Sequence, residues 1–163
     1  MTLTELDHLY QARLTDFARV ATAIAGNVET GLDAVHDAFV ACVRNIAAYR
    51  GDGSLEAWVW RAVVNSALRK RRDSRPVVAV GDDHGHLDSC EPQGWEDLES
   101  IRKAVGDLPE RQRLVLFLRY YADLDYQAIA DALDIKIGTV GAALNAAHTS
   151  LRVSLSKEVL LND

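Results

Sequence analysis

Aromatic and cationic side chains are concentrated in one short stretch of the chain, from Tyr49 to Arg72. Trp58 and Trp60 follow a loop that holds two glycines, and four consecutive cations lie at the end of the stretch. Aromatic faces stack on unpaired bases, and Lys and Arg bind phosphates. The stretch therefore has the residue types that hold single-stranded nucleic acid. Core packing of the tryptophans and cations at a helix C-terminus are the alternative explanations.

The two tryptophans are expected on different sides of one helix. Trp58 continues an apolar stripe with Leu55, Ala62 and Val63, so it is expected to face a core. Trp60 lies off this stripe. We therefore predict that Trp60 is the tryptophan that faces outwards.

A second arrangement with binding potential lies near the C-terminus. Two helical patterns, 126–133 and 138–156, flank a short turn that begins at Asp134. In a helix-turn-helix, a small residue lets the helices cross closely and a turn residue adopts a left-handed conformation. Ala130, Asp134 and Val140 have the right spacing for these roles. The same spacing also occurs in ordinary helical bundles, so the motif alone leaves both interpretations open.

A metal site is considered at His84, His86, Asp88 and Cys90. We do not predict one, because a segment rich in turn residues offers nothing to orient the ligands and one cysteine is a weak zinc pattern. No nucleophile and base are arranged for catalysis elsewhere. The sequence predicts no cofactor and no enzymatic activity of its own.

Three apolar stripes with helical spacing predict three helices around one core in residues 1–73. The first two stripes are Leu6, Tyr10, Leu14, Phe17, Ala21 and Ile24, then Leu32, Val35, Phe39, Cys42 and Ile46. Ser54 is expected to cap the third helix.

Residues 74–99 have the composition of a linker, and residues 76–100 contain seven carboxylates with no Lys or Arg. Helical periodicity then resumes, with Asp107 and Glu110 as an expected capping pair. We predict an all-α protein in which two small helical domains, 1–73 and 100–158, are joined by an acidic flexible linker.

The chain has 163 residues and a net charge of −6, which would normally argue against nucleic-acid binding, but the acidity is concentrated in the predicted linker. Neither a leader peptide nor a membrane span is evident, so a cytoplasmic location is expected. The two cysteines are too few for a disulfide scaffold.

Two sets of motifs resemble one known family. Leu108 to Arg113, Leu118-Arg119-Tyr120, Tyr126 to Ala130 and Gly138-Thr139-Val140 are similar to region 4 of extracytoplasmic-function (ECF, group 4) sigma factors of the sigma-70 family. Leu9-Tyr10, Asp33 to Phe39, Tyr49 to Ser54 and Ala57 to Arg61 resemble region 2 of that family. Both sets occur in the right order. The resemblance implies a subunit that brings bacterial RNA polymerase to promoters and helps to open them.

The resemblance implies roles for three groups of residues. Core-polymerase binding, to a coiled coil on the largest subunit, falls on Asp33, His36, Asp37, Val40 and Arg44. Binding of the minus-10 element falls on Tyr49, Gly51, Asp52, Gly53, Ser54, Trp60, Arg61, Asn65, Arg69, Lys70, Arg71 and Arg72. The helix-turn-helix comprises Tyr126, Ala130, Asp134, Thr139, Val140, Asn145 and His148.

One departure from the family concerns the recognition helix. After Gly138-Thr139-Val140, where the family is rich in Arg and Lys, this chain has small residues with Asn145 and His148. Cations supply most of the affinity of proteins for DNA. We hypothesise that this domain binds minus-35 DNA weakly or not at all, and docks instead on the polymerase flap, an anti-sigma factor or a recruiting protein.

The acidic linker has two interpretations. In the family the connector enters the nucleic-acid channel of the polymerase, where carboxylates can mimic RNA; a solubilising tether is equally compatible with the composition. Two alternative functions also remain open, a polymerase-independent helix-turn-helix regulator and a degenerate sigma-like interaction protein. The free chain is expected to be a monomer.

Overall fold

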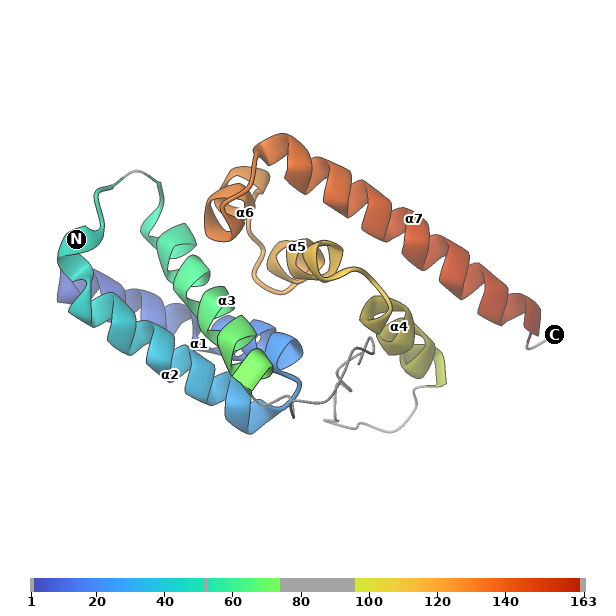
Figure 1. Ribbon diagram of the computed structural model, residues 1–163, viewed down its shortest axis with the longest axis horizontal. Coiled ribbons are helices and arrows are strands. Elements are labelled where there is room, and N and C mark those ends of the chain that lie inside the picture. Colours follow the sequence, from blue (N-terminus) through green and yellow to red (C-terminus); the bar gives the residue numbers. More distant parts are fainter. Residues whose placement is uncertain (1, 52, 74–95, 162–163) are drawn as a thin grey trace.

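The computed structural model describes residues 2–51, 53–73 and 96–161. In the last of these segments the side chains are described for residues 100–156. The elements are α1 (Leu3–Ala25), α2 (Val28–Arg44), a 3-10 turn η1 (Ile46–Ala48), α3 (Leu55–Asp73), α4 (Glu96–Gly106), α5 (Glu110–Tyr120), α6 (Tyr126–Leu133) and α7 (Ile137–Leu161). The described residues form no strand, and the predicted all-α class is confirmed (Figure 1).

Helices α1, α2 and α3 pack on one another as an N-terminal unit, and side-chain caps fix where each helix begins. The Thr2 hydroxyl accepts from the Glu5 amide and the Glu5 carboxylate accepts from the Thr2 amide, which is a capping box. Asn27 caps α2 through the Thr30 amide at 2.8 Å. Ser54 caps α3, as predicted, through the Ala57 amide at 3.0 Å.

The core of the N-terminal unit is built around Phe17, which is fully enclosed. Its ring centroid lies 4.5 Å from that of Trp60 and 5.3 Å from that of Phe39. Gly31 allows α2 to approach α1 closely, since a Cβ at this position would lie 2.7 Å from the Cα of Thr22. The first two predicted apolar stripes therefore face this core, apart from Leu32, which is exposed, and Ile46, which lies beyond the end of α2 in η1.

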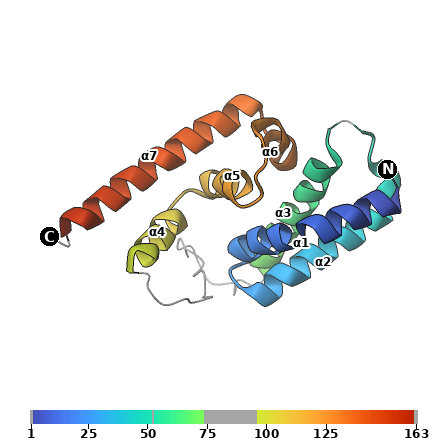
Figure 2. The same ribbon diagram turned by 180° about the vertical axis from the view of Figure 1, so that it is seen from behind.

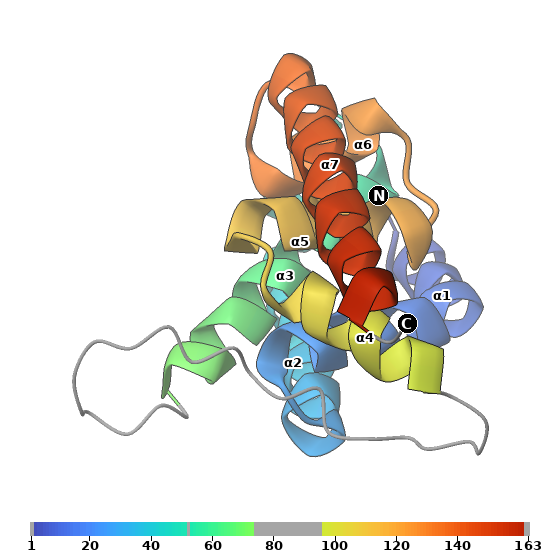
Figure 3. The same ribbon diagram turned by 90° about the vertical axis from the view of Figure 1, so that its right-hand side faces the viewer.

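Helices α4 to α7 form a C-terminal unit in which α7 packs against the other three (Figures 1 and 3). Asp125 caps α6 through the Ala128 amide at 2.8 Å. Asp134 then ends α6 with φ of 56°, the left-handed turn conformation that the sequence predicts at this residue. The predicted capping pair at α5 is wrong: Pro109 occupies the cap without a side-chain bond, and Glu110 binds Arg71 instead.

The two units contact each other, with α6 packed along α3 (Figures 1 and 2). Their buried apolar residues form one continuous cluster. Arg13 of α1 also joins the units, because its guanidinium binds Glu56 of α3 at 2.8 Å and donates to the Ala122 carbonyl between α5 and α6. Helix α4 begins at Glu96, inside the stretch predicted as linker. Within the described residues, no helix is both long and apolar enough to cross a membrane.

Candidate nucleic-acid and polymerase interfaces

The loop before α3 and the start of that helix enclose a cavity of about 250 Å³. The loop is folded back on itself by the Tyr49 hydroxyl, which donates to the Gly53 carbonyl at 2.7 Å. Gly51 and Gly53 have φ of 79° and 139°, values that favour glycine. The lining residues are Ala48, Tyr49, Arg50, Gly53, Ser54, Ala57, Trp58, Arg61 and Asp131. The cavity thus combines the aromatic rings of Tyr49 and Trp58 with the cations Arg50 and Arg61 and the polar side chain of Ser54.

The orientation predicted for the two tryptophans is wrong. Trp60 is fully buried against Phe17, whereas Trp58 is partly exposed and lines the cavity, with its ring centroid 5.6 Å from that of Tyr49. Helix α3 buries positions 59, 60, 63, 64 and 67, which are spaced by three or four residues. The stripe through Leu55 and Trp58 is therefore the half-buried edge of the helix. The aromatic surface available to a base comes from Tyr49 and Trp58.

The structure brings together only part of the predicted minus-10 set. Tyr49, Gly53, Ser54 and Arg61 line the cavity. Gly51 and Asn65 are exposed without lining it, and Asp52 lies outside the described residues. Sequence reasoning did not assign Arg50 or Asp131, the second of which reaches the cavity from α6.

Two of the four cations at the C-terminal end of α3 form ion pairs with carboxylates of other helices. Lys70 lies 2.9 Å from Asp37 on α2 and 3.8 Å from Asp33. The hydrogen bond that the Lys70 ammonium donates to the Asp37 carboxylate raises the pKa of Lys70. Arg71 pairs with Glu110 of α5. Arg69 and Arg72 are exposed and present their charge to solvent, so two of the four predicted phosphate-binding cations face outwards.

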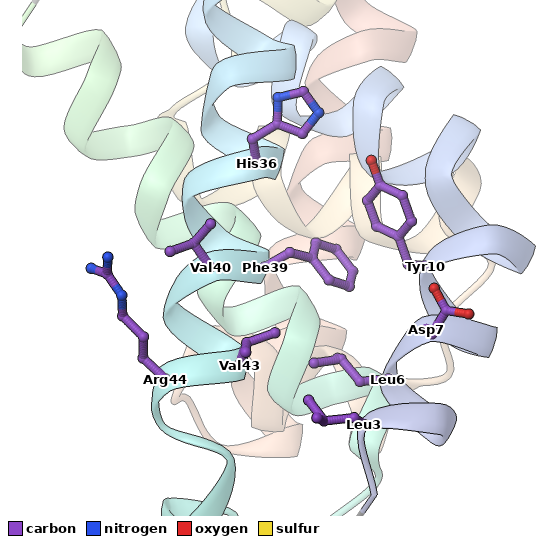
Figure 4. A pocket seen from close by; sticks show the side chains of 9 residues that line it. All are labelled: Leu3, Leu6, Asp7, Tyr10, His36, Phe39, Val40, Val43 and Arg44. Atoms are coloured by element: carbon purple, nitrogen blue, oxygen red, sulfur yellow. The ribbon is translucent and has the colours of Figure 1, made fainter.

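A second, more apolar cavity of about 620 Å³ lies between the start of α1 and the end of α2. It is lined by Leu3, Leu6, Asp7, Tyr10, His36, Phe39, Val40, Val43 and Arg44, and is called the α1/α2 groove below (Figure 4). Leu3, Val40 and Val43 are exposed apolar side chains. Exposed apolar residues gathered in a groove are typical of a protein-binding surface.

Three of the residues predicted to bind polymerase, His36, Val40 and Arg44, line the α1/α2 groove. Asp33 and Asp37 are exposed on α2 but pair with Lys70 on α3. Val43 and Leu3 were not assigned from the sequence. Val43 could have been found, since it lies three residues after Val40 on the same helix.

The helix-turn-helix has the predicted internal geometry. Ala130 in α6 and Val140 in α7 are both buried, and Thr139 is half-buried. Tyr126, Asn145 and His148 are exposed, and the Tyr120 hydroxyl lies 2.9 Å from His148 Nε2. From Ile137 to Leu151, α7 has no Lys or Arg. The exposed face of α7 up to Leu151 therefore carries no Lys, Arg, Asp or Glu.

His84, His86, Asp88 and Cys90 lie outside the described residues, as does most of the predicted linker. In the part of the chain that the structure does describe, no group of three His, Cys, Asp or Glu side chains could hold a metal ion.

Two family models match the chain in the predicted order. The model "Sigma-70 region 2" matches residues 9–76, and "Sigma-70, region 4" matches residues 98–149. Among curated relatives, RNA polymerase sigma factor SigV of Bacillus subtilis is 24% identical over 146 residues, which covers 89% of this chain and 87% of that protein. The ECF RNA polymerase sigma-E factor of Escherichia coli is 27% identical over 150 residues, with 82% and 78% covered.

Two solved structures share the fold. CnrH, in complex with the cytosolic domain of CnrY, superposes with a TM-score of 0.72 and 18% identity over 96% of this chain and 90% of that one. The sigma factor RpoE from Bartonella quintana, in complex with the anti-sigma factor NepR, superposes with a TM-score of 0.69 and 20% identity. The match covers 93% of this chain and 97% of that one. The chain belongs to the sigma-70 family of RNA polymerase sigma factors, in its extracytoplasmic-function group, with the N-terminal unit as region 2 and the C-terminal unit as region 4.

Proposed function

We propose that this sigma factor binds core polymerase through the α1/α2 groove and captures an unpaired base of the minus-10 element in the cavity beside Tyr49 and Trp58. The observation that carries the proposal is the cavity itself, which combines the rings of Tyr49 in the loop and Trp58 in α3 with the guanidinium of Arg61. Aromatic stacking stabilises an unstacked base, and a guanidinium binds the adjoining phosphate. We propose that the protein acts in the cytoplasm and that the polymerase, not this chain, catalyses RNA synthesis.

Polymerase binding is assigned to the groove because its apolar residues are bordered by charge. Val40 and Val43 supply exposed apolar area, while Asp7 and Arg44 lie at the edge. Such a surface suits a helical partner whose apolar side chains enter the groove and whose charged residues meet its rim. A helix of the polymerase's largest subunit is the proposed occupant. The flap is a second contact proposed for the C-terminal unit.

The C-terminal unit is proposed to contribute little to minus-35 binding. A protein gains affinity for duplex DNA mainly by placing cations near phosphates, and the exposed face of α7 carries none from Ile137 to Leu151. Asn145 can still contact a base edge. We assign to this face a protein contact instead, with an anti-sigma factor or a recruiting protein; the solved relative RpoE is bound to an anti-sigma factor, NepR.

The first test is binding of the full chain to core RNA polymerase. A Val40→Asp and Val43→Asp double variant places two charges in the groove, and we expect at least a tenfold loss of affinity, about 1.4 kcal/mol or more. The matched control is Gln11→Asp with Thr15→Asp, which adds the same charge to exposed positions of α1 that do not line the groove. Absence of saturable binding by the wild-type chain would sink the proposal.

A degenerate, sigma-like binding protein is the second candidate, because the neutral α7 face removes one of the two DNA contacts. Selection of single-stranded DNA from a random pool by the holoenzyme separates the two functions. Enrichment of a common short motif that Trp58→Ala abolishes supports minus-10 capture. Polymerase binding without any enrichment would identify the degenerate protein.

A further inference from the structure

The cavity assigned to a minus-10 base is partly filled by the C-terminal unit of the same chain. Asp131 of α6 is one of its lining residues. A Cβ at Gly53 would lie 3.4 Å from Asp131 Oδ2, so the Asp131 carboxylate lies next to the loop before α3. Gln127 orients the carboxylate by donating to Asp131 Oδ1 at 2.9 Å. A negative group is thus held where the nucleotides of single-stranded DNA would enter.

A second carboxylate, that of Asp134 at the C-terminal end of α6, forms an ion pair with Arg61 of the cavity. Asp134 Oδ1 lies 2.7 Å from a terminal nitrogen of Arg61. Carboxylate and phosphate oxygens bind a guanidinium in the same way, so Asp134 takes the place that a phosphate would take. The left-handed turn at Asp134 presents this side chain beyond the end of α6.

Other contacts hold the C-terminal unit in this position. Glu110 of α5 pairs with Arg71, a second cation of the DNA-binding set. Arg13 donates to the Ala122 carbonyl. Helix α6 packs along α3, and the buried apolar cluster is continuous across the contact. Arg61 and Arg71 are therefore both paired with carboxylates of the C-terminal unit, which also reaches the cavity through Asp131.

We propose that region 4 of the free chain inhibits region 2 by acting as a DNA mimic, with Asp131 at the base cavity and Asp134 on Arg61. This inference rests on the proposed function, because it requires that the cavity be the minus-10 site. The α1/α2 groove is lined only by α1 and α2 residues, so it stays open in the closed arrangement. Polymerase can bind there first and DNA can bind once α6 has left α3.

The contact is suited to opening. The Arg61 and Asp134 side chains are 41% and 83% exposed, and exposed ion pairs contribute little and are screened by salt. The arrangement is a reversible cover and not a permanent domain interface.

The first arm of the test measures whether the units are closed in solution. Spin labels at Arg19→Cys on α1 and Ser150→Cys on α7, both exposed, report the distance between the units in a Cys90→Ser chain. Cys42 is buried and remains unlabelled. The expected distance distribution is single and narrow. Asp131→Asn with Asp134→Asn is expected to broaden it, and Asn at 134 keeps the left-handed turn.

The second arm measures binding of the same variants to a fluorescent pool of random single-stranded DNA. If about nine tenths of the free chain is closed, complete opening would tighten binding about tenfold, and the Asn double variant is expected to bind several-fold more tightly than wild type. Glu29→Gln with Asp123→Asn is the control, since it removes two negative charges without touching the α3 and α6 contact. The control is expected to bind within about twofold of wild type.

The outcomes separate this inference from the proposed function. A narrow distance that broadens together with the gain in DNA binding supports the inference. A broad distance in the wild-type chain overturns it and leaves the minus-10 proposal standing. Opening without any gain in DNA binding also overturns it, and counts against the cavity as a DNA site. An equal gain in the charge control shows general repulsion and overturns the mimicry.

Discussion

Trp60 is enclosed between α1 and α3, while Trp58 lies at the rim of the cavity, and their substitution should have opposite consequences. Trp60→Ala leaves a large void beside Phe17 and is expected to lower the free energy of unfolding by about 3–5 kcal/mol. Trp58→Ala should cost clearly less but abolish binding of single-stranded DNA. Urea unfolding and DNA titration measure the two effects. Equal losses of stability would contradict the assignment.

Cys42 gives the protein a pH dependence in the alkaline range. Burial raises the pKa of its thiol from 9.0 to about 11. Above pH 9 the unfolded chain releases the thiol proton while the folded chain keeps it, so stability falls as pH rises towards 11, by up to about 3 kcal/mol. Urea unfolding at pH 8 and pH 10.5 measures the loss. The slope should be smaller in Cys42→Ala, and an unchanged slope would show that other groups cause it.

The tryptophans also mark how far residue types determine the site. The sequence identifies which stretch holds aromatic and basic side chains, because their clustering is visible without coordinates. It does not determine which face of α3 is buried, since the stripe of Leu55, Trp58, Ala62 and Val63 overlaps at Val63 with the stripe of Val59, Trp60, Val63 and Val64. Packing against Phe17 selects the second stripe. A contact between distant residues therefore decided which tryptophan faces the cavity.

At the scale of elements, Gly31 sets the distance between α1 and α2. A methyl group there would lie 2.7 Å from backbone atoms of Thr22, which cannot move without shifting α1. Gly31→Ala is expected to destabilise the chain by about 1–3 kcal/mol. Gly138→Ala is the control, because a Cβ there meets open space in α7 and should stabilise the helix by about 0.5–1 kcal/mol. Thermal unfolding should show shifts of opposite sign, and a gain for Gly31→Ala would contradict the close crossing.

The neutral face of α7 predicts what is needed to make it bind duplex DNA. Ala142 and Ala146 are both exposed on this helix. Replacing both with Arg should raise affinity for random duplex DNA and steepen the logarithmic salt dependence by about two. Replacing both with Gln adds length without charge and should change neither. If the wild-type chain already showed a steep salt dependence that the Arg variant leaves unchanged, cations elsewhere would dominate.

Helix ends and turns were predictable to different degrees. Ser54 and Asp134 lie at positions where local chemistry alone fixes the conformation, so the cap and the left-handed turn follow from the sequence. The pair Asp107 and Glu110 fits the same local rule, yet Pro109 occupies the cap and Glu110 binds Arg71. A partner from another helix had no signal in the local pattern.

At the scale of the whole molecule, the two units were predicted as separate domains and their contact was not. The residues that join them, Arg61, Arg71 and Asp134, are charged and exposed types that the sequence assigns to solvent or DNA. Only the folded arrangement brings Asp131 to the cavity of the N-terminal unit.

The ion pair between Arg71 and Glu110 allows the contact to be measured without DNA. In a double-mutant cycle with Arg71→Met and Glu110→Gln, the coupling in the free energy of unfolding should be about 1 kcal/mol at low salt, because Arg71 is largely covered, and should shrink at 1 M salt. Arg119 and Asp123, which pair within the C-terminal unit, are the control, since their coupling does not depend on closure. Strictly additive effects at 71 and 110, with coupling retained in the control pair, would mean that α5 leaves α3 in solution and that the units are open before polymerase binds.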